Sequence, residues 1–105
     1  MYGNNIASGK VAGTGAALNV SIGFKPRVVC LINVAAGGLI SIDWNVDMGE
    51  ATGFKRIATG VASQLAALGV SQYAGSQGAN TEGFTIGADA DMNVNGEYIH
   101  YIAYR

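Results

Sequence analysis

The side chains that most often carry out catalysis are scarce in this chain, which contains one histidine and one cysteine. A catalytic triad needs a base beside its nucleophile and a third group that orients the base, and a structural zinc site needs several Cys and His ligands. His100 alternates with tyrosines and an isoleucine, which favours a packed or interface histidine. Cys30 lies in an apolar run, which indicates a buried, inert thiol. We therefore expect no enzyme, no catalytic residue, no cofactor and no zinc site.

The carboxylates gather in two short groups, and neither has the spacing of a known site. Glycosidase chemistry needs two carboxyl groups at a fixed separation across a cleft, and nothing in the sequence marks a cleft. The second group resembles a calcium loop in its spaced oxygen ligands, but Gly96 comes at the eighth position instead of the sixth, and His100 replaces the final glutamate. We expect solvated loop carboxylates and no metal. The groups are Asp43, Asp47 and Glu50, and Asp89, Asp91 and Glu97.

The composition indicates a folded domain with few groups to solvate its surface. Charged residues make up 12% of the chain, against about a quarter in typical domains, and 50% of the residues are hydrophobic. Such a surface is expected to be covered by a protein partner, with a compact monomer as the alternative. The six basic residues are scattered and the net charge is −1, so we expect no nucleic-acid partner. No leader or membrane-spanning run is evident, so we expect no membrane partner and synthesis in the cytoplasm.

Short alternating runs separated by glycine-rich breaks predict one all-β domain, a sandwich or barrel. Residues 27–34 are apolar on both faces, which predicts a strand that is central or lies under a partner. Residues 39–46 predict a half-buried strand with Trp44 as its core anchor. Residues 59–69 carry apolar side chains at helical spacing, which predicts at most one short helix near 60–68, with an irregular loop as the alternative. Asn95-Gly96 predicts a hairpin turn between a strand that ends at Val94 and a strand over 97–105.

Several short motifs, in this order, resemble a small β-sandwich domain of tailed-bacteriophage virion proteins. The resemblance covers residues 18–105 and implies an antiparallel Greek-key or jelly-roll-like β-sandwich. It implies a capsid decoration (cement) protein or a tail-associated protein, and it transfers no catalytic residue. Residues 1–17 lie outside it, and their small residues predict a flexible N-terminal arm. The motifs are Gly23-Phe24-Lys25-Pro26, Val28-Val29, Asn33, Trp44, Gly83-Phe84-Thr85-Ile86-Gly87, Asn95-Gly96-Glu97 and Tyr101-Ile102-Ala103.

The resulting functional hypothesis is a non-enzymatic structural protein on the outer capsid surface of a virion, made in the bacterial host cytoplasm. Its expected partners are the major capsid protein and further copies of itself, with a trimer favoured because a trimer matches a three-fold position of a shell. The alternative is a tail-associated receptor- or carbohydrate-binding module that uses exposed tyrosines. The candidate partner-binding residues are Tyr2, Lys25, Arg27, Lys55, Arg56, Tyr98, His100 and Tyr104.

Overall fold

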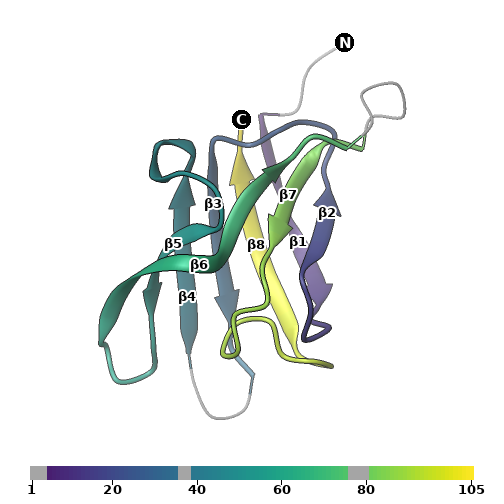
Figure 1. Ribbon diagram of the computed structural model, residues 1–105. Helices are drawn as coiled ribbons and strands as arrows, with labels where there is room; N and C mark the ends of the chain where they lie inside the picture. Colours follow the sequence, from purple (N-terminus) through teal and green to yellow (C-terminus); the bar gives the residue numbers. More distant parts are fainter. Residues whose placement is uncertain (1–4, 36–38, 76–80) are drawn as a thin grey trace.

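The computed structural model describes residues 5–35, 39–75 and 81–105, whose regular secondary structure is almost entirely β-strand (Figure 1). All strand pairings are antiparallel, so the predicted all-β antiparallel class is confirmed. The strands are β1 (Ile6–Ala12), β2 (Leu18–Ser21), β3 (Val28–Asn33), β4 (Ile40–Asn45), β5 (Thr52–Arg56), β6 (Ala62–Tyr73), β7 (Gly83–Ile86) and β8 (Tyr98–Tyr104). A single 3-10 turn, η1 (Val46–Met48), follows β4.

The eight strands form one sheet in the order β1-β8-β3-β4-β5-β6-β7-β2. Strands β3 to β7 are neighbours in sequence and in space, whereas long connections bring β2 beside β7 and β8 beside β3. The sheet curls so that β6, β7 and β2 lie across one face of β3 and β8, which makes the molecule sandwich-like and nearly barrel-shaped (Figure 1). The curl leaves β1 and β2 as the two edge strands and separates an inner face from an outer face.

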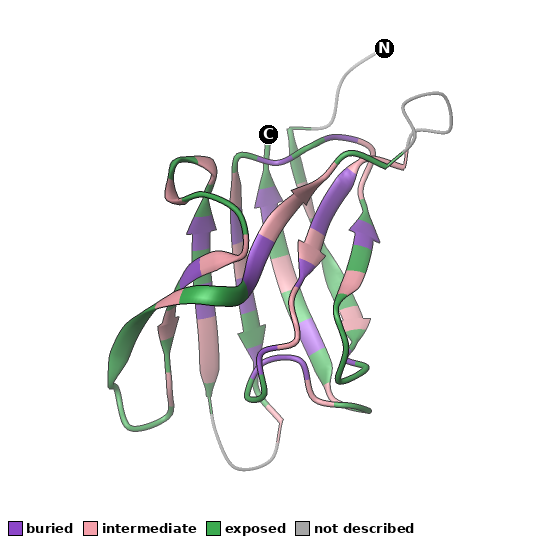
Figure 2. Cartoon of the chain, viewed as in Figure 1, coloured by how far each residue is buried: buried purple, intermediate pink, exposed green. Residues whose placement is uncertain are grey.

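The core lies on the inner face. Buried and more exposed residues alternate along several strands of the sheet (Figure 2). Trp44 is the core anchor that the alternation predicted: it is 1% exposed, and its Nε1–H donates to the carbonyl of Gly49 at 2.8 Å. The rings of Phe84 and Tyr101 pack edge to face, with their centroids 5.3 Å apart. Burial of each large apolar side chain stabilises the fold by about 1.5–3 kcal/mol. The other buried members are Val20, Val29, Leu31, Ile42, Val70, Ile86, Met92, Ile99 and Ala103.

The segment with helical spacing is not a helix or a loop, because most of it lies in β6. The first part of β6 pairs with β5 and the last part pairs with β7, so the strand passes from one layer to the other. Between these parts the register with β5 jumps from Leu65 to Val70, and Leu68 takes a positive φ of 64°. Gly69 lies so close to the backbone of Thr52 that a Cβ would collide with it. Pairing with two neighbours therefore overrides the weak helical preference.

The predicted hairpin is right in its turn and wrong in its first strand. A turn does form at Asn95-Gly96, where the N–H of Glu97 donates to the carbonyl of Val94 at 3.0 Å. However, no strand precedes this turn, because residues 87–97 form an irregular connection. The carboxylate of Asp89 accepts hydrogen bonds from the backbone N–H groups of Asp91 and Met92, and this local turn replaces a strand ladder.

The predicted boundary after residue 17 does not separate an arm from the sheet. Ile6–Ala12 forms β1, which pairs with β8 over its whole length. The small residues of this segment alternate too weakly to predict a strand from the sequence. In the fold, pairing with β8 at seven positions stabilises the strand. Tyr2 lies outside the described residues.

Candidate interaction surface

The outer face is the side of β1, β8, β3, β4 and β5 that points away from the core. Of the ten large hydrophobic side chains exposed in the described residues, six lie here, and the outer face is therefore the main apolar surface of this part of the chain. They are Ile6 on β1, Tyr98, Ile102 and Tyr104 on β8, Ile32 on β3 and Phe54 on β5. Strand β3 is central, as predicted, and on its outer side Val28 and Cys30 are half-buried while Ile32 is exposed.

Two of the cations on the outer face lie over aromatic rings. The Nζ of Lys10 is 4.5 Å from the ring centroid of Tyr98, and the guanidinium of Arg56 is 5.6 Å from that of Phe54. A cation over a ring keeps its charge close to apolar surface, so these residues interrupt the apolar face only slightly. Asp43, on β4, is the carboxylate of this face. The outer face is thus apolar with sparse charges of both signs.

The structure brings together four of the eight predicted partner-binding residues. Tyr98, His100 and Tyr104 alternate along β8, and Arg56 lies at the end of β5 on the same face. Lys25 and Arg27 are exposed in the connection between β2 and β3 and lie beyond the end of the face. The backbone of Arg27 continues the sheet, since its N–H donates to Tyr104 and its carbonyl accepts from Val46, both at 2.8 Å.

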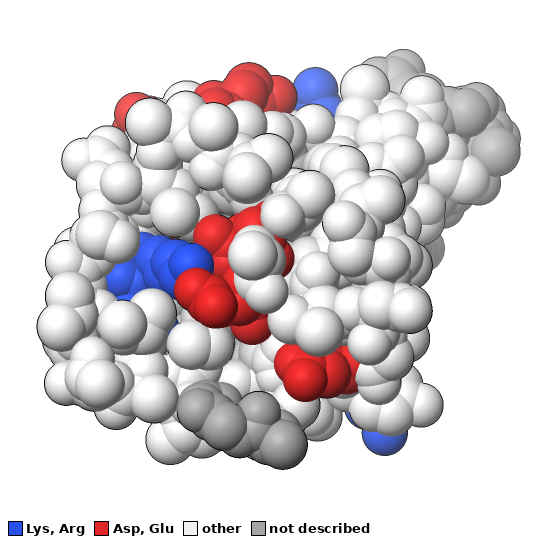
Figure 3. All heavy atoms as spheres, turned by 60° about the horizontal axis from the view of Figure 1, so that its bottom comes forward, with Lys and Arg blue, Asp and Glu red and all other residues white. Residues whose placement is uncertain are grey.

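Lys55 points to the other side of β5 and is not part of the outer face. Its Nζ lies 3.0 Å from Asp89 Oδ2 and 2.7 Å from Asp91 Oδ2, and the side chains of Lys55 and Asp89 are 12% and 8% exposed. These two salt bridges therefore attach the 87–97 connection to β5. The same contact occupies the carboxylates that resembled a calcium loop, and within the described ranges no cluster of three metal-ligating side chains occurs. Figure 3 shows positive and negative side chains in contact at this end of a largely uncharged surface.

We expect stability to fall at alkaline pH through Lys55. Burial by itself lowers the pKa of Lys55, but the hydrogen bonds and charges of Asp91 and Asp89 outweigh it, so the pKa lies above its ordinary value of 10.5. Because the folded state holds this proton more tightly, the stabilisation is complete below pH 10.5 and disappears as pH rises through the higher folded pKa. Urea unfolding between neutral pH and pH 12 should show this decline, and the variant Lys55→Met should lack it.

Two buried asparagines hold the irregular connection, and sequence reasoning did not assign them this role. The side-chain amide of Asn93 uses its full hydrogen-bonding capacity: Oδ1 accepts from the N–H groups of Thr14 and Gly15, and Nδ2 donates to the carbonyls of Ala16 and Gly87. Asn33 Nδ2 donates to Met92 O and to Glu97 Oε1, both at 3.0 Å. Their position between apolar neighbours in sequence was the available signal, because a polar residue in such a run is buried only when it is satisfied.

Cys30 is half-buried on the outer face of β3 and is not part of the core, which corrects its predicted placement. Its pKa is raised first by burial, and further by the negative charge and hydrogen bonding of Asp43. A raised pKa reduces the thiolate fraction at neutral pH, and the thiolate is the reactive form. The expected low reactivity thus follows from Asp43 as well as from burial.

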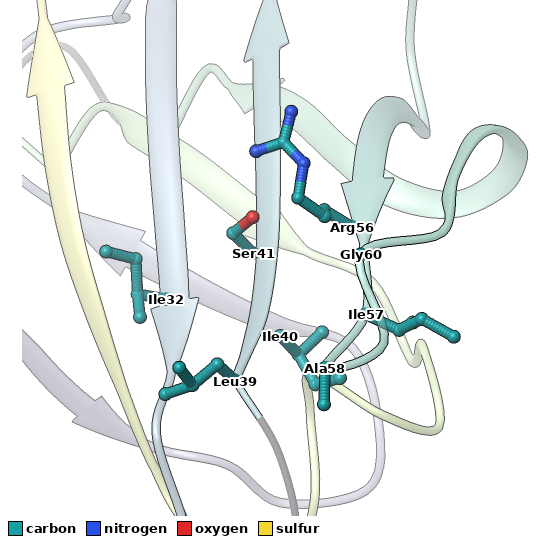
Figure 4. Close-up of a pocket in the computed structure, with 8 residues that line it drawn as sticks. All are labelled: Ile32, Leu39, Ile40, Ser41, Arg56, Ile57, Ala58 and Gly60. Atoms are coloured by element: carbon teal, nitrogen blue, oxygen red, sulfur yellow. The ribbon is translucent and has the colours of Figure 1, made fainter.

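An apolar groove lies at one end of the outer face, between the end of β3, the start of β4 and the turn after β5 (Figure 4). It has a volume of about 370 Å³. Leu39, Ile40 and Ala58 lie at its lower end in this view, and Arg56 lies at the upper end beside Ser41. The groove extends the apolar surface and contains no pair of groups suited to acid–base chemistry.

No family model, curated protein or solved structure matches this chain. In the part of the chain that the structure describes, no helix is long and apolar enough to cross a bilayer.

Proposed function

We propose that this chain is a non-enzymatic virion structural protein, a capsid decoration (cement) protein that docks on the major capsid protein and stabilises the head. The observation that carries the proposal is the outer face, where six large apolar or aromatic side chains are exposed on β1, β8, β3 and β5. The resemblance of its short sequence motifs to virion β-sandwich proteins is the reason for proposing a capsid protein as the partner.

The composition of the outer face fits an interface better than it fits a solvated surface. The central patches of protein–protein interfaces are enriched in aromatic residues and depleted in charged ones. On the outer face Tyr98 is 53% exposed and Ile102 is 42% exposed, while Lys10 and Arg56 lie over rings. Each Å² of apolar surface removed from water contributes about 25 cal/mol. Docking of this face would therefore hold a subunit on a shell without requiring a cleft or a catalytic group.

The second candidate function is a tail-associated receptor- or carbohydrate-binding module. Its supporting observation is the exposure of Tyr98 and Tyr104, because sugars stack on exposed rings. The Lys10 ammonium already lies over the ring of Tyr98, which leaves less of that ring for a sugar. A glycan array separates the two functions, since consistent saccharide binding would favour the receptor module.

The test of the proposal is co-sedimentation with heads purified from phage that lack this protein. We expect the purified chain to bind such heads saturably and to raise the temperature at which they rupture. Failure to bind the heads, with binding to tails or to glycans instead, would overturn the decoration function.

Replacement of Ile102 by aspartate should weaken binding to the heads at least tenfold. The side chain faces outward at the middle of β8, so the charge would be placed in the interface and would lose its hydration on docking. The matched control is Val61→Asp, because Val61 is 62% exposed and precedes β6, outside the outer face. Equal binding by both variants would contradict the assignment of the outer face, provided that both retain the circular dichroism spectrum of the parent.

A further inference from the structure

Edge strand β1 presents an open row of backbone hydrogen-bonding groups. At its two ends the N–H of Arg105 donates to Asn5 O at 2.8 Å and the N–H of Gly13 donates to Glu97 O at 2.7 Å. Because bonding alternates along an antiparallel strand, the odd-numbered residues of β1 bond to β8. The even-numbered residues direct their N–H and C=O groups away from β8, and among the described strands β1 pairs with β8 alone. These residues are Ile6, Ser8, Lys10 and Ala12.

Of the features by which monomeric proteins protect an edge strand, this edge has only a single lysine. β1 has no proline, and its pairing with β8 runs over seven positions without a register shift. Its one charged residue is Lys10, and edge lysines usually discourage pairing with another chain. Here the Nζ of Lys10 lies over the ring of Tyr98 on the neighbouring strand β8, which draws the charge away from the free edge. The other edge strand, β2, has four residues and offers a shorter row.

We propose that two copies of this chain pair edge to edge through β1, antiparallel about a two-fold axis at Gly9. In this register Ile6 lies opposite Ala12 of the partner subunit, and Ser8 lies opposite the partner's Lys10. Each open backbone group of one strand then meets an open group of the other, because the even-numbered positions pair with even-numbered positions. Registers displaced by two residues leave some of these groups unpaired.

The strand β1 is suited to a second copy of itself for reasons of charge and shape. The register puts no like charges directly opposite each other, since each Lys10 faces a serine. Ile6, which is 60% exposed, gains the partner's Ala12 as a neighbour. The two outer faces also become continuous, because Tyr104 lies beside Ile6 in one subunit and Tyr98 lies beside Ala12 in the other. A two-fold contact of this kind closes on itself and replaces the trimer expected from shell symmetry.

The register can be tested with opposite charges at Ser8, by analytical ultracentrifugation over a range of concentrations. The wild type should show a monomer–dimer equilibrium. Ser8→Glu places a carboxylate opposite each Lys10 of the partner and should tighten dimerisation about fivefold, whereas Ser8→Lys places like charges opposite each other and should weaken it about fivefold. Ser8→Pro removes a donor that faces only the free edge and should abolish the dimer.

The matched controls are Ser21→Glu and Ser21→Lys on edge strand β2, which should leave the association unchanged. The proposal is overturned if the wild type remains monomeric at every concentration, or if it forms trimers that the Ser8 variants do not affect. Equal dimer constants for Ser8→Glu and Ser8→Lys would overturn the register. None of these measurements uses phage particles, so the outcome does not depend on the proposed function.

Discussion

Replacement of Asn93 by alanine is expected to lower the free energy of unfolding by about 3 kcal/mol. Asn93 is 2% exposed, and its amide makes four hydrogen bonds to backbone groups. Alanine would leave the half-buried carbonyl of Gly87 without this donor and the N–H groups of Thr14 and Gly15 without their acceptor. The cost of leaving a partly buried polar group unpaired exceeds the net gain of forming a hydrogen bond. The measurement is urea unfolding followed by tryptophan fluorescence, since Trp44 is the single tryptophan.

The matched control is Asn95→Ala, two residues away. Asn95 is exposed and is not among the non-glycine residues with positive φ, so alanine fits its backbone conformation. Its effect should stay within about 0.5 kcal/mol. Asn93→Asp should retain the acceptor for the N–H groups of Thr14 and Gly15 but lose both donated bonds. A loss below 1 kcal/mol for Asn93→Ala, taking ~3 kcal/mol as the expectation, would show that the connection is held by other contacts.

Replacement of Lys55 by methionine should cost about 3 kcal/mol at neutral pH. Methionine retains most of the apolar stem but removes the ammonium, so the nearly buried carboxylate of Asp89 loses its counter-ion. Asp89 also organises the start of the irregular connection through its hydrogen bonds to Asp91 and Met92. The loss should therefore appear in the unfolding free energy and in faster hydrogen exchange over residues 89–93.

The control for this variant is Arg56→Met at the next position along β5. Arg56 faces outward over Phe54, and no salt bridge involves it in the described residues. Its removal should change stability by less than about 0.5 kcal/mol. If Lys55→Met and Arg56→Met have equal effects on stability, then the contact with Asp89 and Asp91 does not stabilise the fold. The pair also separates folding from docking, because Arg56→Met alone alters the outer face.

The two adjacent cations Lys55 and Arg56 show the limit of sequence reasoning at the surface. Both were predicted to bind a partner, since loop and strand-end charges give no indication of direction. Successive residues of a strand point to opposite faces, so at most one of them could have faced a given partner. Which of the two faced outward depended on the side of β5 on which the 87–97 connection lies, and Asp89 in that connection is 34 residues from Lys55 in sequence.

The amino-acid sequence by itself determined the class of the fold, because alternation in residues 39–46 and 97–105 is a local property that survives in any all-β arrangement. It also determined the core role of Trp44 and the sharing of one strand face by Tyr98, His100, Ile102 and Tyr104, whereas the structure decided that this face points outward. Only the tertiary structure decided the path of β6, the absence of a strand before Asn95-Gly96 and the inclusion of β1 in the sheet. Strands β1 and β6 are fixed by hydrogen bonds to other strands, and residues 87–97 are held by the local turn at Asp89 together with bonds that join Asn33 and Asn93 to distant parts of the chain. Local preferences for helix or strand are too weak to compete with these bonds.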